Sequence, residues 1–172
     1  MVAKTGRASV LVLLTRWSDA LSALPTCEVT RTKSDWISLH IRAMVALKTG
    51  DFSAADKMLQ NGISHCRFHD CQDYFHGAMA SLRIHQAALA DAALEISKLS
   101  DSFKVPRLAL SCQLAIKKND NEKALEILEQ FPSPSNSQTA ETFAELRRLA
   151  LGHPPVHTEK WLFHQQLSLL AA

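Results

Sequence analysis

Residues 39–59 restrict the fold of this chain more than any other stretch, because they predict two short helices joined by a tight turn. Apolar and small side chains recur at helical spacing in both halves: Leu39, Ala43, Ala46 and Leu47 in the first, and Phe52, Ala55, Met58 and Leu59 in the second. Gly50 can adopt the left-handed conformation that ends the first helix, and the Asp51 side chain can cap the start of the second. These residues therefore predict a helical hairpin.

The pattern of this hairpin recurs along the chain with a period of 34 or 35 residues. Three sets of positions follow the period: the alanines Ala20, Ala55, Ala90 and Ala124, the leucines Leu24, Leu59, Leu94 and Leu128, and the small residues Ala8, Ala43, Ala78 and Cys112. A fixed period of this length is typical of arrays in which each helical hairpin stacks on its neighbours. We therefore expect an all-α fold.

Composition agrees with a helical domain and excludes several classes of protein. The chain has 172 residues, 47% of them hydrophobic and 21% charged, with only five Gly and six Pro, which favours a folded, helix-rich domain over disorder. A net charge of +2 is too small to favour nucleic acid as a partner. Four Cys are too few and too unevenly spaced for a disulfide framework in a chain of this length.

Neither a membrane span nor a signal peptide is predicted. No apolar run approaches the roughly 18 residues that a transmembrane helix needs. Lys4 and Arg7 precede an apolar run at residues 10–14, but this run ends after five residues, which is too short for the apolar region of a secretion signal. We therefore expect a cytoplasmic protein.

The chain resembles the tetratricopeptide-repeat family over about residues 1–138. The family's first helix carries a large apolar residue, then Leu-Gly, then Tyr, and its second helix carries Ala with an aromatic residue four positions later. The matching positions in the clearest copy are Leu39, Arg42-Ala43, Ala46, Ala55 and Leu59, and Gly50-Asp51-Phe52 is similar to the family's turn. The chain departs from the pattern where Ala43 replaces Gly, where Leu59 replaces the aromatic residue, and where Pro106 lies outside the family's place between repeats.

The resemblance implies a right-handed array of antiparallel helical hairpins, an α-solenoid, whose inner groove is lined mainly by the first helix of each hairpin. We expect repeats at about residues 1–35, 36–70, 71–104 and 105–138. Beyond a stretch rich in Pro and Ser, residues 139–172 predict two atypical helices that cap the open end of the array. The alternative is that the final helix packs elsewhere or forms an interface with a partner.

The residues most suited to metal binding cluster at His65-Cys66-Arg67-Phe68-His69-Asp70-Cys71. Cys and His side chains bind zinc, but no second half-site follows at zinc-finger spacing. We interpret the cluster as a polar connection with two partly buried thiols, and Cys27 and Cys112 as core residues. The sequence contains no HExxH motif, Gly-rich phosphate loop or Gly-x-Ser-x-Gly motif, so we expect no enzyme activity, no metal and no cofactor.

The candidate site is the face of the first helices that would line the groove. The resemblance places there Ile37, His40, Met44 and Leu47 of the second repeat, Gln72, Phe75, Met79 and Leu82 of the third, and Ala109, Gln113 and Ile116 of the fourth. Lys48, Arg83 and Lys117 lie one position beyond these residues and predict a basic row along one rim. Met adapts to varied apolar ligands, and a basic row favours an acidic flank on the ligand. Solvated charges at helix ends are the alternative for the row.

These features predict a non-enzymatic module that binds another protein, or an extended or helical peptide. Its size and layout are similar to the small tetratricopeptide chaperones of bacterial type III secretion, which hold apolar segments of other proteins. Some members of the family hold the carboxylate tail of heat-shock chaperones with a clamp of Lys, Asn and Arg. That clamp is absent here, because its positions are His40, Met44, His76, Pro106 and Leu110. The alternatives are a structural subunit or homo-oligomer that uses its terminal helices, and an RNA-binding helical repeat, which the apolar groove disfavours.

Overall fold

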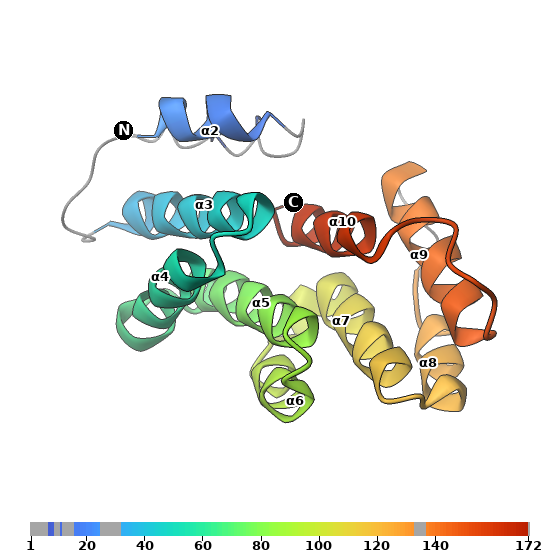
Figure 1. Cartoon of the computed structure of the whole chain (residues 1–172). Helices are drawn as coiled ribbons and strands as arrows, with labels where there is room; N and C mark the ends of the chain where they lie inside the picture. Colours follow the sequence, from blue (N-terminus) through green and yellow to red (C-terminus); the bar gives the residue numbers. More distant parts are fainter. Residues whose placement is uncertain (1–6, 9–10, 12–15, 25–31, 133–136, 172) are drawn as a thin grey trace.

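The computed structural model describes residues 7–8, 11, 16–24, 32–132 and 137–171 of the chain (Figure 1). This part is built of helices and contains no β-strand, so the all-α prediction is confirmed. None of its helices is both long enough and apolar enough to cross a bilayer. Most of the predicted first helix of residues 1–35, and Cys27, lie outside the described residues.

The helices follow one another along the chain with short connections. Their bounds are α2 Trp17–Ala23, α3 Lys33–Thr49, α4 Phe52–His65, α5 His69–His85, α6 Leu89–Ser97, the short 3-10 helix η1 Asp101–Phe103, α7 Lys104–Lys117, α8 Asn121–Leu128, α9 Ser137–Ala150 and α10 Glu159–Ala171. Three pairs of consecutive helices pack most extensively: α3 with α4, α5 with α6, and α7 with α8. Each pair also packs on the next, because α5 contacts α3 and α4, and α7 contacts α5 and α6.

The same backbone turn ends the first helix of each pair. Its central residue has a positive φ in all three turns: Gly50 at 87°, Ala87 at 58° and Asn119 at 58°. The amide of the following residue donates to the carbonyl five positions back, at 2.9 Å in each turn: Asp51 to Ala46, Ala88 to Arg83 and Asp120 to Ala115. This is the hydrogen bond of a Schellman motif. The turn predicted at Gly50 and Asp51 is confirmed, since the Asp51 side chain also accepts the Ala54 amide at 3.1 Å and caps α4.

Burial follows the predicted period, with one shift of register. The small residues Ala8, Ala43, Ala78 and Cys112 are all fully buried. In α6, however, Ala90 and Leu94 are exposed, and Ala92 and Ile96 are buried in their place. The reason is that Ala87 lies nine residues after Ala78, whereas Gly50 lies only seven residues after Ala43. Two additional residues before the turn therefore displace the buried face of α6 by two positions.

The two C-terminal helices pack differently from each other. α9 packs on α8 and α7 and so covers the end of the third pair, as a capping helix is expected to do. It ends in the same turn as the first helices, with Gly152 at a φ of 74° and the His153 amide 3.0 Å from the Arg148 carbonyl. α10 then runs back along the molecule and packs on α5, α7, α9 and α3 (Figure 1). α10 therefore contacts α5 and α3 in addition to α7 and α9, which form the predicted capped end.

Phe75 lies at the centre of the larger of two core clusters. Its side chain is fully buried, and its ring packs edge-on against Trp36 with the ring centroids 6.2 Å apart. A Cβ atom on Gly62 would lie 2.3 Å from the Phe75 ring, so the missing side chain at Gly62 allows α4 and α5 to approach this closely. The same cluster continues into α10 through Phe163 and Leu167, while Leu162 of α10 belongs to the second cluster, with α7, α8 and α9.

Replacing Ala87 with Gly tests the shared turn. A non-glycine residue at a φ of 58° is strained, because its Cβ lies too close to the next carbonyl oxygen. This strain costs roughly 1–2 kcal/mol. Glycine relieves this strain, but part of the gain is offset because glycine loses more conformational entropy on folding. We therefore expect Ala87→Gly to raise the free energy of unfolding by about 0.5–1 kcal/mol, measured by urea denaturation followed by circular dichroism. Ala144→Gly, at an exposed position inside α9, is the control and is expected to lower it by about 1 kcal/mol. Lower stability of Ala87→Gly would contradict the left-handed turn.

Candidate protein-binding surface

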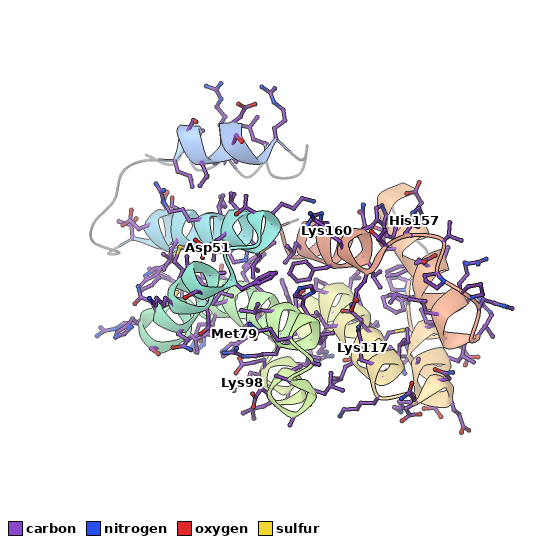
Figure 2. All side chains as sticks on the ribbon, in the orientation of Figure 1. Asp51, Met79, Lys98, Lys117, His157 and Lys160 are labelled. Carbon is purple, nitrogen blue, oxygen red and sulfur yellow. The ribbon has the colours of Figure 1, made fainter. Side chains whose placement is uncertain are left out.

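α10 lies across the C-terminal ends of the three first helices. Glu159, at its start, forms an ion pair with Lys117 at the end of α7. Phe163 stacks on His85 at the end of α5, and His164 lies beside Lys48 near the end of α3. We call the surface beneath α10 the α10 seat, and it comprises Lys48, Phe52, His85, Gln113, Ile116 and Lys117. Figure 2 labels Lys117 of this surface together with Lys160 of α10.

An aromatic pair holds the middle of α10 on the seat. The Phe163 and His85 rings stack with their centroids 4.6 Å apart, and Phe52 lies 4.9 Å from His85 and 6.3 Å from Phe163. Phe163 is only 3% exposed, and Leu167, one turn further along, is fully buried. Burial of an apolar side chain of this size contributes roughly 1.5–3 kcal/mol, so these two residues bind α10 strongly to the helices beneath it.

A small cavity remains between α7, α9 and the start of α10. Its volume is about 190 Å³, and Gln113, Ile116, Glu145 and Leu162 are among the residues that line it. Gln113 is buried, and its side-chain oxygen accepts no hydrogen bond from the described residues. The buried Glu145 carboxylate accepts the amides of Val156 and His157, at 2.9 and 3.2 Å, and so fixes the connection before α10 to α9.

Charges distinguish the two ends of the seat. The hydrogen bond from Lys117 lowers the pKa of Glu159, so this carboxylate stays ionised beside α7. At the α3 end, burial and the nearby Lys160 lower the pKa of Lys48. Burial, together with Lys48 and Lys160, also lowers the pKa of His164 to about 4. At neutral pH the His164 imidazole is therefore uncharged.

The apolar residues predicted to line an open groove are instead buried in the core. Met44, Leu47, Phe75, Met79 and Leu82 are at most 3% exposed, and Ala109 is 1% exposed. Ile37 and Ile116 are half-buried. The prediction of an open apolar groove lined by Met44 and Met79 is therefore wrong. The reason is that the first helices pack on neighbouring helices with nearly their whole apolar surface, and α10 covers their ends.

Two of the predicted polar residues, His40 and Gln72, also contact other residues inside the molecule. His40 is buried against the rings of Tyr74 and Phe75, with centroids 5.4 and 5.7 Å away, and burial lowers its pKa to about 4. The Gln72 side-chain amide donates to the Cys66 carbonyl at 2.8 Å. Neither side chain is available for an external ligand in this arrangement.

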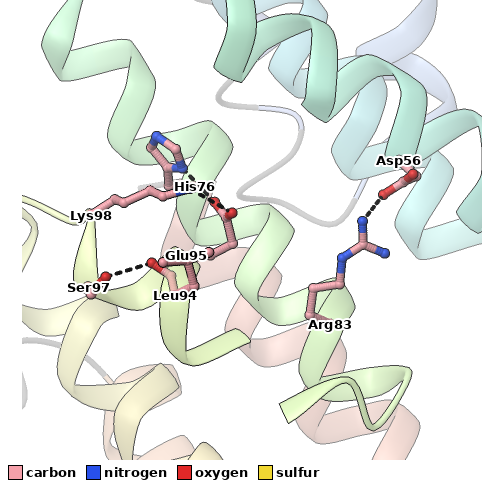
Figure 3. A network of polar contacts seen from close by, with 7 residues as sticks. All are labelled: Asp56, His76, Arg83, Leu94, Glu95, Ser97 and Lys98. Atoms are coloured by element: carbon pink, nitrogen blue, oxygen red, sulfur yellow. Dashed lines mark hydrogen bonds and ion pairs between the residues drawn. The ribbon is translucent and has the colours of Figure 1, made fainter. Parts of the chain in front are cut away.

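The predicted basic row needs one correction. Lys48 and Lys117 flank α10, but Arg83 points away and donates to Asp56 of α4 at 2.6 Å (Figure 3). Arg83 also donates to Gln86 at 2.9 Å. His85, two residues further along α5, lies in the row instead. The same register shift that lengthens α5 explains this, since the helix ends two residues later than the period predicts.

The cluster from His65 to Cys71 offers little reactivity. Cys66 and Cys71 are buried, and burial raises the pKa of both thiols, that of Cys71 to about 11. Burial raises the pKa of Cys112 to about 12. At neutral pH such thiols stay protonated, and a protonated thiol is a poor nucleophile and metal ligand. In the part of the chain that the structure describes, no three His, Cys, Asp or Glu side chains converge to hold a metal ion.

Comparison with known proteins assigns no family or function to the chain, because no family model, no curated protein and no solved structure matches it. The resemblance to tetratricopeptide repeats therefore stays a prediction. The function has to be argued from the packing of α10.

The sequence did not point to Phe52 and His85 of the seat, or to Phe163 of α10, which packs on them. Phe52 was assigned to the hairpin core, and Phe163 lies in a helix whose apolar residues are spread around its circumference. The available signal was the aromatic content of the last helix, which carries Trp161 and Phe163. The residues that these two aromatic side chains contact could not be predicted from the sequence, because they depend on the position of α10 in the folded chain.

Replacing both methionines tests their burial. Met44 and Met79 are 0% and 3% exposed, so Met44→Glu with Met79→Glu places two unpaired charges in the core. We expect the free energy of unfolding to fall by more than about 4 kcal/mol, with loss of helical circular dichroism. Leu94→Glu, at a residue that is 57% exposed, is the control and should change it by less than about 0.5 kcal/mol. If the double variant kept the full helical signal, both methionines would have to lie in an open groove and not in the core.

Acidification tests the environment of His164. Its pKa in the folded chain, about 4, lies below the roughly 6.5 that is usual for histidine, so its contribution to stability is complete above about pH 6.5 and is lost as the pH falls towards 4. His40 shifts in the same direction. We therefore expect the melting temperature to fall from pH 7 to pH 5, and to fall less in His164→Gln, in which only the His40 contribution remains. Equal losses in both chains would show that His164 is not buried beside Lys48 and Lys160.

Proposed function

We propose that this chain is a non-enzymatic helical-repeat protein that binds a helical segment of another protein at the α10 seat. Its most concrete form is a small chaperone or adaptor that holds an apolar segment of its partner. The observation that carries the proposal is the position of α10, because a helix of the chain already occupies a surface made by the ends of three other helices.

In this proposal α3 to α8 form three antiparallel hairpins of a tetratricopeptide-like array, and α2 belongs to a further repeat. Two observations support a repeating unit. The first is the shared left-handed turn at Gly50, Ala87 and Asn119. The second is close packing at the small residue of each first helix, where the Cys112 thiol lies 3.7 Å from the Ala124 carbonyl of the second helix.

A helical protein segment suits the α10 seat better than a small molecule or a nucleic acid does. The contacts of α10 extend over α3, α5 and α7, while the cavity beside it measures only about 190 Å³, below the roughly 300–1,000 Å³ of ordinary small-molecule sites. Phe52, His85 and Ile116 offer apolar and aromatic surface, whereas nucleic acid requires many phosphate-binding cations. Helix-in-groove recognition uses the combination found here, an apolar centre with polar ends.

Site-specific cross-linking tests the proposal. Ile116 is half-buried in the seat, and Ala144 lies exposed on α9. We would place photoreactive p-benzoylphenylalanine at either position in the full chain, with and without Phe163→Asp, which weakens the docking of α10. We expect a partner protein to cross-link at position 116, at least about tenfold more in the Phe163→Asp chain, and not at position 144.

Each other outcome of this experiment contradicts the proposal. Cross-linking of a partner only at position 144 moves the interaction to another surface. Cross-linking of a second copy of the chain at position 116 favours a homo-oligomeric structural role instead. Equal cross-linking at position 116 with and without Phe163→Asp would mean that α10 does not cover the binding surface.

A further inference from the structure

We infer that α10 is an internal copy of the ligand, and that the partner segment is a helix with an acidic residue, a Leu-aromatic pair three and four positions later, and a Leu four positions beyond the aromatic residue. In α10 these are Glu159, Leu162, Phe163 and Leu167. The inference rests on the proposed function, because it names the class of partner that the same surface accepts.

The aromatic position is the most restrictive of the four. Phe163 stacks on His85 at an interplanar angle of 28°, and the His85 ring lies between Phe163 and Phe52. An aliphatic side chain cannot stack on an imidazole in this way. A ligand without an aromatic residue here would leave the His85 ring uncovered.

The two leucine positions require apolar side chains because both are deeply buried. Leu162 and Leu167 are 5% and 0% exposed and belong to different core clusters, so each enters the repeats at a separate place. Leu162 also lines the cavity beside Gln113 and Ile116. Charged or β-branched polar residues at either position would leave buried apolar surface unmatched.

The acidic position sets the direction of the ligand helix. Lys117 lies at the α7 end of the seat, where Glu159 in the first turn of α10 pairs with it, and an acidic residue is also favoured there by the helix dipole. The opposite end meets Lys48 near the end of α3. A ligand helix bound in the reverse direction would leave Lys117 unpaired and bring its acidic first turn to Lys48, whose pKa is lowered by burial.

The segment that precedes α10 is anchored to α9, although its His157 ring also stacks on Trp161 of α10 with the centroids 3.8 Å apart. The connection is held to α9 by the Glu145 carboxylate and by Arg148, whose guanidinium donates to the Pro154 carbonyl at 2.9 Å. These bonds do not involve α10. The ion pair with Lys117 is half-exposed, and exposed pairs contribute little. A tethered helix has an effective concentration in the millimolar range, so a free ligand has to compete with it.

A synthetic peptide provides the direct test. The probe is residues 157–172 with a fluorescent label, and binding is measured by fluorescence anisotropy. We expect the full chain carrying Phe163→Asp to bind this peptide at least about tenfold more tightly than the wild-type chain, in which α10 competes. A peptide that itself carries Phe163→Asp is the matched control and should not bind. Ala144→Asp places the same charge on exposed α9 and should bind like the wild type.

A charge exchange tests the direction of binding. Lys117→Glu in the Phe163→Asp chain should weaken binding of the natural peptide a few-fold, and a peptide carrying Glu159→Lys should restore it. If circular dichroism shows that Phe163→Asp unfolds the chain, Glu159→Lys in the otherwise wild-type chain serves instead, since it removes only the ion pair. It should increase binding of the natural peptide a few-fold.

Two results would overturn the inference. One is a folded Phe163→Asp chain, or Glu159→Lys chain, that binds the peptide no better than the wild type does. The other is binding that is indifferent to the charge exchange. If a partner still cross-links at position 116 in either case, the proposed function stands and only the ligand pattern is wrong. If the peptide binds but no partner cross-links there, the proposed function is wrong instead.

Discussion

The left-handed turn that ends α3, α5 and α7 is the constraint on which the rest of the structure depends. Each turn closes its helix with a hydrogen bond to the carbonyl five residues back and reverses the chain within two or three residues. Because the same reversal occurs three times, the three helix ends lie near one another. The side chains in their last turns then form one surface. Lys or His at such ends is favoured by the helix dipole, which explains the basic character of that surface before any ligand is considered.

The packing of α10 follows from this arrangement. The ends of α3, α5 and α7 are covered only in part by other helices, with Phe52 at the start of α4 lying against His85. Phe163 and Leu167 fill that exposed region and continue the core that is centred on Phe75. The core and the candidate site are therefore continuous. A change in how firmly α10 is held therefore alters the stability of α3, α5 and α7, and a change in these helices alters the seat.

Local signals in the sequence predicted local structure well. The Gly50-Asp51 turn, the burial of the small residues in each first helix and the all-α class all depend on residues within one hairpin, where spacing and capping chemistry decide the outcome. The register of α6 was not predictable from the period, because two additional residues in α5 moved the buried positions from Ala90 and Leu94 to Ala92 and Ile96. The same shift replaced Arg83 by His85 in the basic row. The methionines were assigned to a groove because their helical face was identified correctly but its covering partner was not visible.

By itself, then, the sequence determined that this chain forms helices, where each pair of helices turns, and which small residues allow the pairs to pack closely. These are consequences of backbone conformation and side-chain size over a few neighbouring residues. Only the tertiary structure decided that α10 folds back over α5, α7 and α3 instead of extending the array. That choice depends on contacts between Phe163, Phe52 and His85, which are separated by up to 111 positions in the chain. No periodicity within a hairpin carries information about such a contact, because it arises from the shape that the assembled hairpins present.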